Sequence, residues 1–114
     1  MKYHNKVTLC AQNKTHQSKL EAKRCDELHL LQQAGEIYDL RAHPQETWRL
    51  EVKGALIAKY QTDFTYMTGE NADPPNVYVV EDTKSKATMT PTYRIKKKLM
   101  KAIHGIEITE VFAR

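Results

Sequence analysis

The stretch VYVVEDTK, residues 77–84, is the segment from which the fold can be worked out. Its mostly apolar start is typical of a central strand that is buried in a sheet. Side chains alternate along a strand, so Asp82 and Lys84 are expected on one face and Glu81 on the other. A buried strand that ends in two acids and a lysine is either a solvated strand end or a site where these charges converge.

Helical patterns flank this strand at a distance on both sides. The segment from residue 19 to about 34 has leucines at helical spacing, with Ser18 and Glu21 in a capping-box arrangement before them and Gly35 after them. Further on, Thr90 and a proline at the first helical position predict a second helix that runs to residue 104. The sequence therefore predicts one helix early in the chain and one directly after the central strand.

Strand-like runs fill the rest of the chain. Residues 36–43 could form a strand, residues 48–52 and 55–67 are strand-like runs, and Lys53-Gly54 predicts a tight turn between the last two. Residues 68–76, TGENADPPN, have the composition of a loop. The final run, residues 106–112, places Glu110 on the same side as two isoleucines. The expected order of elements is α-β-β-β-α-β, preceded by an arm at residues 1–17 with a short strand near Val7 to Leu9.

Composition and charge limit the class of protein. A chain of 114 residues is long enough for one core, and no run of 18 apolar residues predicts a membrane span. The start is basic but has no apolar region, so no signal peptide is expected, and Cys10 and Cys25 are expected as reduced thiols. Residues 1–24 and 91–104 each carry a net charge of +5, whereas residues 25–90 carry −5. Two basic segments around an acidic centre suit a protein that attracts phosphates to a metal site.

Four residues form the candidate site. If the strand that contains Asp63 lies antiparallel to the central strand, Asp63 can come beside Asp82. Two adjacent carboxylates are costly unless a divalent cation such as Mg²⁺ lies between them. Lys84 could orient or deprotonate a water there and offset charge on a phosphate, and Glu21 could supply a further ligand.

Each of these residues also has a structural explanation. Glu21 could serve only the helix cap, and Asp63 could be an exposed strand residue. Asp82 and Lys84 could form a surface ion pair of small energetic value. The five histidines have no mutual metal spacing, and the sequence has no nucleophile elbow or glycine-rich phosphate loop.

The ordered set of motifs resembles the PD-(D/E)xK nuclease superfamily, and within it a family of small phage and prophage proteins. The resemblance rests on SKLEAKR, ELHLLQQAGEI, Asp63-Phe64 with Tyr66, VVEDTK, and TPTYRIKKKLM followed by HGIEITEV, and it covers most of residues 18–111. The proline that names the motif is absent, since Thr62 precedes Asp63. The resemblance implies a restriction-endonuclease-like α/β core, in which a mixed central sheet is flanked by helices, as a single domain over residues 18–114.

The resemblance also implies the roles of the site residues. Asp63 and Asp82 would be the metal ligands, Lys84 the catalytic lysine and Glu21 the first-helix acid, for Mg²⁺ or Mn²⁺. Glu81 is a further candidate ligand, through its backbone carbonyl. Phosphate contacts are expected from the basic helix, with a tyrosine that could stack or position: Tyr93, Arg94, Lys96, Lys97, Lys98 and Lys101.

The leading hypothesis is therefore a metal-dependent DNA endonuclease of phage type, cytoplasmic in a bacterial host, which could act on branched or junction DNA and could work as a homodimer. The alternative is a DNA-binding module that keeps the fold without activity. A third interpretation, an interaction protein whose charge only solubilises it, predicts no more DNA binding than any weakly basic protein has.

Overall fold

A four-stranded mixed sheet forms the centre of the protein, seen here in a computed structural model that describes residues 8–11, 15–16, 18–42 and 45–112. The strand order is β3-β6-β7-β8, with β3 and β6 antiparallel, β6 and β7 antiparallel, and β7 and β8 parallel. The strands are β3 (Ile37–Arg41), β6 (Phe64–Thr68), β7 (Tyr78–Lys84) and β8 (Ile108–Phe112). The mixed central sheet expected for the α/β class is confirmed.

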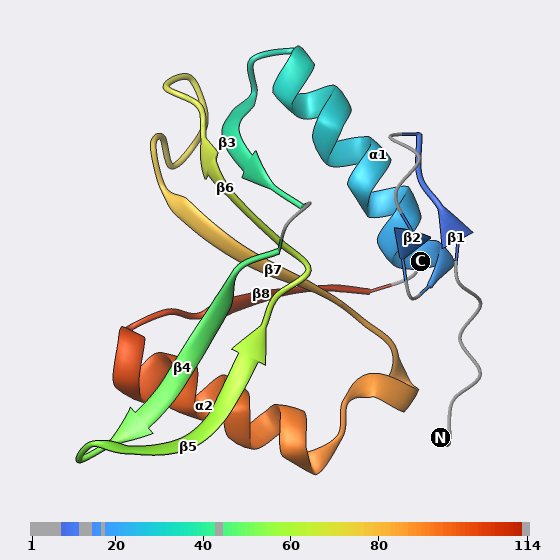
Figure 1. The fold of residues 1–114 in the computed structure, drawn as a ribbon. Helices are drawn as coiled ribbons and strands as arrows, with labels where there is room; N and C mark the ends of the chain where they lie inside the picture. Colours follow the sequence, from blue (N-terminus) through green and yellow to red (C-terminus); the bar gives the residue numbers. More distant parts are fainter. Residues whose placement is uncertain (1–7, 12–14, 17, 43–44, 113–114) are drawn as a thin grey trace.

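Two helices cover the sheet, α1 (Lys19–Gln33) and α2 (Pro91–His104), on opposite sides in Figure 1. Both begin as the sequence predicts, because Ser18 Oγ accepts from the backbone N–H of Glu21 and Thr90 Oγ1 accepts from that of Tyr93. Gly105 ends α2 in the left-handed conformation, at φ 68°, which glycine adopts without strain. Helix α2 connects the parallel strands β7 and β8, as parallel pairing requires.

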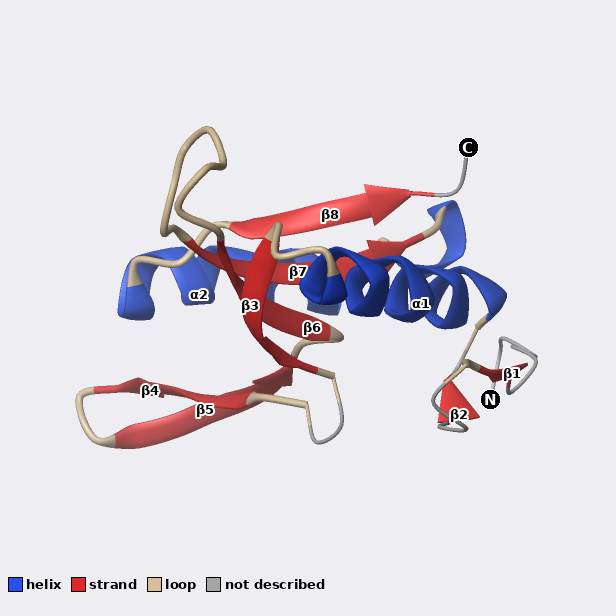
Figure 2. Cartoon of the chain, turned by 90° about the horizontal axis from the view of Figure 1, so that it is seen from above, coloured by secondary structure: helices blue, strands red, loops and turns tan. Residues whose placement is uncertain are grey.

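A two-stranded ribbon, β4 (Thr47–Val52) and β5 (Ala55–Gln61), is inserted between the first two strands of the sheet. Its turn is at Lys53 and Gly54, at φ 50° and 82°, which are the positive values that a tight hairpin turn needs. The ribbon packs beside α2 (Figures 1 and 2). The predicted turn is confirmed.

The prediction of one strand over residues 55–67 is wrong, because the chain changes sheets at Thr62 and Asp63. The backbone N–H of Thr62 still donates to the carbonyl of Glu46, at 3.1 Å, beside the start of β4. The next N–H, that of Asp63, donates instead to the side chain of Asp82 on β7. The alternation of side chains with a period of two residues continues through both strands. The pattern alone therefore could not reveal the break.

The remaining elements are short. β1 (Thr8–Leu9) pairs antiparallel with β2 (Thr15–His16), and η1 (Lys86–Thr88) is a single 3₁₀ turn between β7 and α2. Of the predicted arm, residues 1–7, 12–14 and 17 lie outside the described residues, and so does Val7 of its expected strand. Cys10 and Cys25 are buried and are not joined in a disulfide, with their sulfur atoms 3.6 Å apart.

Two hydrophobic clusters lie on the two faces of the sheet. The cluster on the α1 face includes Leu28, Phe64 and Tyr66, and the cluster on the α2 face includes Val80, Met100 and Leu50 of the ribbon. Neighbouring β7 residues therefore belong to different layers, as the alternation predicts. No helix in the described part of the chain has the length and apolar character needed to span a membrane.

Candidate active site

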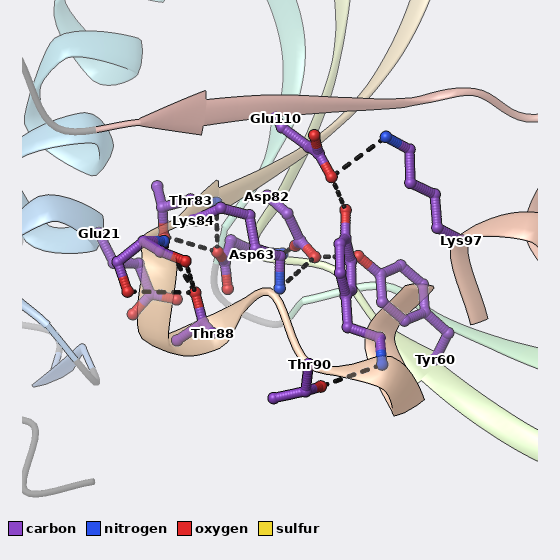
Figure 3. Close-up of polar contacts among 12 residues, drawn as sticks. Glu21, Tyr60, Asp63, Asp82, Thr83, Lys84, Thr88, Thr90, Lys97 and Glu110 are labelled. Carbon is purple, nitrogen blue, oxygen red and sulfur yellow. Dashed lines mark hydrogen bonds and ion pairs between the residues drawn. The ribbon is translucent and has the colours of Figure 1, made fainter. Parts of the chain in front are cut away.

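A cleft of about 720 Å³ opens where the end of β7 meets four other elements. Its walls come from the start of α1, the end of β5, the η1 turn and the start of α2. Asp63, Asp82 and Lys84 line it together with Glu21 (Figure 3). The four residues singled out from the sequence thus meet in one place.

Asp82 is the most enclosed acid of the cleft, with 3% of its surface exposed. Its Oδ1 accepts from the backbone N–H of Asp63 at 2.8 Å, and its Oδ2 accepts from the hydroxyl of Tyr60 and lies 3.6 Å from Lys84 Nζ. Burial raises the pKa of Asp82 to about 6, although Lys84 and the Asp63 N–H act in the opposite direction. Burying this carboxylate is thus only partly compensated by its neighbours.

Asp63 lies in the connection between β5 and β6 and faces the same cleft. Its Oδ2 accepts from both the backbone N–H and the hydroxyl of Thr83, each at 2.8 Å. Since Asp63 also donates its own N–H to Asp82, the two acidic residues are locked together by bonds that run in both directions between the two chain segments. The antiparallel arrangement of β6 and β7 brings Asp63 beside Asp82, as predicted.

Lys84 points into the cleft at the end of β7, with 12% of its side chain exposed. Its Nζ lies 3.6 Å from the centre of the Tyr93 ring, a cation–π contact, as well as 3.6 Å from Asp82. The Tyr93 hydroxyl donates to Glu110 at 2.7 Å, and Lys97 Nζ lies 3.1 Å from the same carboxylate. Lys84 is therefore held between an anion and an aromatic face.

Tyr93 is buried, and this position corrects the expectation that it could stack on a base. Burial, and then its hydrogen bond to Glu110, raise the pKa of Tyr93 far above its usual range. Burial also raises the pKa of Glu110, but the hydrogen bonds from Tyr93 and Lys97 outweigh this effect and lower it overall. Of the two roles predicted for Tyr93, only positioning agrees with its place in the structure.

Glu21 lies on the first turn of α1 and is 4% exposed. Its backbone N–H completes the cap with Ser18, while its side chain lines the cleft and accepts from Gln45 Nε2 at 3.5 Å. The two explanations for Glu21, helix cap and site residue, are thus compatible.

Glu81 lies on the opposite face of the sheet, where its side chain is fully buried. Arg24 of α1 donates to both of its carboxylate oxygens, at 2.6 and 3.0 Å, and the Tyr66 hydroxyl donates to it at 2.6 Å. The hydrogen bond to Glu81 raises the pKa of Arg24 further, against the effect of burial. The Glu81 side chain therefore joins α1 to the sheet and is not among the residues that line the cleft, and metal binding through the Glu81 backbone carbonyl stays a prediction.

The basic residues of α2 have different surroundings. Lys97 and Lys101 pair with Glu110 and Glu107 of the following segment, and Lys101 Nζ lies 3.3 Å from its partner. Lys96 lines the cleft, and Arg94 and Lys98 are exposed. Only part of the basic helix therefore lies at the cleft and is free of acidic partners within the described residues.

A family model described as a protein of unknown function (DUF1064) matches residues 1–111. The chain belongs to this family. No curated protein and no solved structure matches the chain.

The acids of the cleft can be compared with the needs of a metal ion. Among the described residues, no group of three His, Cys, Asp or Glu side chains is close enough to hold one. Mg²⁺ has a smaller requirement, because it keeps several waters and is often bound through one or two carboxylates and substrate phosphate. Asp63 and Asp82, which both line the cleft, supply two carboxylates, and a cation would offset the cost of burying Asp82.

Sequence reasoning missed two members of the site in this DUF1064 protein. Tyr60, in the strand-like run of residues 55–67, is not among the site residues expected from the sequence, yet its hydroxyl donates to Asp82. Glu110 carried a visible signal, since it was the one acid on an otherwise apolar strand face, and that face packs against Tyr93. A polar group within an apolar stripe is the pattern that could have identified both residues.

Proposed function

We propose that this DUF1064 protein is a metal-dependent DNA endonuclease that hydrolyses phosphodiester bonds with Mg²⁺ or Mn²⁺. One observation carries the proposal: Asp63 and Asp82 are locked together at the wall of a cleft, with Lys84 beside Asp82. The order of Asp63 just before β6, then Asp82 and Lys84 on β7, is also what the resemblance to PD-(D/E)xK nucleases implies.

The carboxylates of Asp63 and Asp82 would hold the metal, and Glu21, which lines the same cleft, would hold a metal-bound water. When bound, the metal would supply positive charge to the phosphate oxygens and make a water easier to deprotonate. The hydrogen bonds from Thr83 to Asp63 and from Tyr60 to Asp82 fix both carboxylates before substrate arrives. Such preorganisation avoids the cost of reorganising dipoles during the reaction.

Lys84 would act on the phosphate and the attacking water. Its ammonium group can offset the negative charge that develops on the phosphate, or orient the water that attacks it. Its cation–π contact with Tyr93 restricts where the ammonium group can lie.

A cleavage assay with labelled DNA tests the proposal. Cleavage should require Mg²⁺ or Mn²⁺ and should fall by about 100-fold or more in Asp82→Ala and in Lys84→Ala, while both variants still bind DNA. Lys86→Ala is a matched control, because Lys86 is an exposed lysine of the η1 turn just after Lys84. Equal cleavage by the wild type and both site variants would overturn the proposal.

A DNA-binding module without activity is the second candidate, and two observations favour it. Both oxygens of Asp82 already accept hydrogen bonds, and the cleft has no group of three ligands within the described residues. Calorimetric titration with Mn²⁺ separates the candidates, because a nuclease should bind the metal in a way that Asp63→Ala abolishes. A binding module should show no metal binding that depends on Asp63, with DNA affinity unchanged in that variant.

A further inference from the structure

The groups that would act on the phosphate lie deep in the cleft. Asp82 is 3% exposed, Glu21 is 4% exposed and the Lys84 side chain is 12% exposed. A phosphate that reaches them must therefore enter the cleft rather than rest across its rim. This condition restricts which nucleic acids can react.

Duplex DNA cannot easily meet this condition. It is stiff over about 50 nm, far more than the width of the cleft, and it keeps its two backbones at fixed distances across the grooves. Each phosphate of a duplex is therefore carried on a rigid surface with its partner strand alongside. A single strand bends freely and can bring one phosphate inward without a second strand following.

Two lysines border the cleft from different walls. Lys59 comes from β5 of the ribbon and Lys96 from α2, and both line the cleft. Neither forms an ion pair with an acid in the described ranges of the chain, unlike Lys97 and Lys101 of the same helix. These two ammonium groups are thus available to phosphates that approach from either side.

The aromatic residues of the cleft favour a contact with the backbone of the strand rather than with its bases. Tyr60 and Tyr93 are buried, and their hydroxyls are bonded to Asp82 and Glu110. Neither ring presents a free face on which a base could stack, although stacking is the usual source of base contacts in single-strand binding. Binding should therefore depend on phosphates, be insensitive to sequence and weaken with salt.

We propose that the cleft accepts a single strand of nucleic acid, with Lys59 and Lys96 contacting its phosphates from the two walls. The inference rests on the proposed function and names its substrate class: single strands and unpaired ends, in preference to intact duplex. The contacts are to phosphates and use neither bases nor a sugar hydroxyl, so single-stranded DNA and RNA share the chemistry, and the test distinguishes them.

The first experiment compares cleavage of four labelled substrates in Mg²⁺: single-stranded DNA, single-stranded RNA, blunt duplex DNA and a duplex with a single-stranded overhang. The single strand should be cut at least about tenfold faster than the blunt duplex, a difference of about 1.4 kcal/mol, and cuts in the fourth substrate should fall within the overhang. Cleavage of the blunt duplex as fast as the single strand would overturn the inference and leave the proposed function standing. Comparable rates of cleavage on single-stranded RNA would show that the substrate class includes both DNA and RNA.

The second experiment measures binding, so it tests the inference even if no substrate is cleaved. A complete lack of cleavage would contradict only the proposed function. Affinity for oligothymidylate is measured against salt concentration in the Asp82→Ala background, with Lys59→Ala, Lys96→Ala or Lys101→Ala added. Each phosphate contact on a single strand contributes about 0.7 to the slope of log affinity against log salt. Lys59→Ala and Lys96→Ala should each reduce the slope by about this amount.

Lys101→Ala is the matched control, because Lys101 lies on the same helix as Lys96 but pairs with Glu107 outside the cleft. It should leave the slope unchanged. An equal loss of slope in all three variants, or equal affinity for blunt duplex and oligothymidylate, would contradict the inference.

Discussion

The backbone N–H of Asp63 donates to Oδ1 of Asp82 at 2.8 Å, across the point where the chain leaves the ribbon and enters the sheet. This bond means that the position of one candidate ligand depends on the charge of the other. It also explains why the chain changes sheets at this residue, because the Asp63 N–H has its partner on β7 and not in the ribbon.

The protonation of Asp82 should make the stability of the protein depend on pH. Burial raises the pKa of Asp82 from 3.8 to about 6, so the folded protein binds this proton more tightly than the unfolded chain does. The resulting stabilisation is fully present below about pH 4 and is lost as the pH rises through about 6, which amounts to at most about 3 kcal/mol. In Asp82→Asn this contribution should be absent.

The measurement is the free energy of unfolding in urea, without metal, for both proteins between pH 4 and 7. The difference between wild type and variant isolates Asp82 from the other carboxyl groups. A difference that does not change with pH would show that Asp82 does not bind its proton more tightly in the folded protein.

The buried ion pair on the other face of the sheet should be essential for stability. Arg24→Met leaves Glu81 buried without its partner, and breaking such a pair typically costs about 3–5 kcal/mol. The double variant Arg24→Met/Glu81→Gln should recover part of this loss, because no charge is then left buried. Arg49→Met, which breaks the exposed pair with Glu51, should cost less than about 1 kcal/mol and serves as the control.

The contacts around Asp82 and around Glu81 were predictable from the sequence only in part. The two helices were predictable because their caps, Ser18 and Thr90, are local signals next to the residues that they serve. The separation of Glu81 from Asp82 followed from strand alternation. Arg24 lies 57 residues before Glu81, and no local pattern connects the two. The break at Thr62 was hidden for a related reason, since it depends on a partner in another strand.

The side chain of Thr62 offers a test of the local packing beside the site. It is fully buried, and its hydroxyl has no hydrogen-bond partner among the residues that the structure describes. An unsatisfied buried hydroxyl costs free energy, and valine has nearly the same shape. Thr62→Val should therefore raise the free energy of unfolding by roughly 1 kcal/mol. A clear loss of stability in urea unfolding would show that the hydroxyl is bonded.

The ring of Tyr93 should matter more to the reaction than its hydroxyl does. Tyr93→Phe keeps the aromatic face under Lys84 and loses only the hydrogen bond to Glu110, whereas Tyr93→Leu loses the face itself. Since a desolvated cation–π contact is worth up to about 2 kcal/mol, Tyr93→Leu should reduce kcat by about tenfold more than Tyr93→Phe does. KM should change little in either variant if the ring positions Lys84. A loss confined to KM, or equal losses of kcat, would contradict this role.

The central claim is that Asp82 and Lys84 act together on a phosphodiester bond, and the rate of cleavage of a labelled single strand tests it most directly. Initial rates are compared in Mg²⁺ and in EDTA for the wild type, Lys84→Ala and Lys86→Ala. Cleavage should occur only with Mg²⁺, should persist in Lys86→Ala and should fall by about 100-fold or more in Lys84→Ala, with strand affinity retained. Cleavage that continues in EDTA, or that Lys84→Ala leaves unchanged, would contradict the claim.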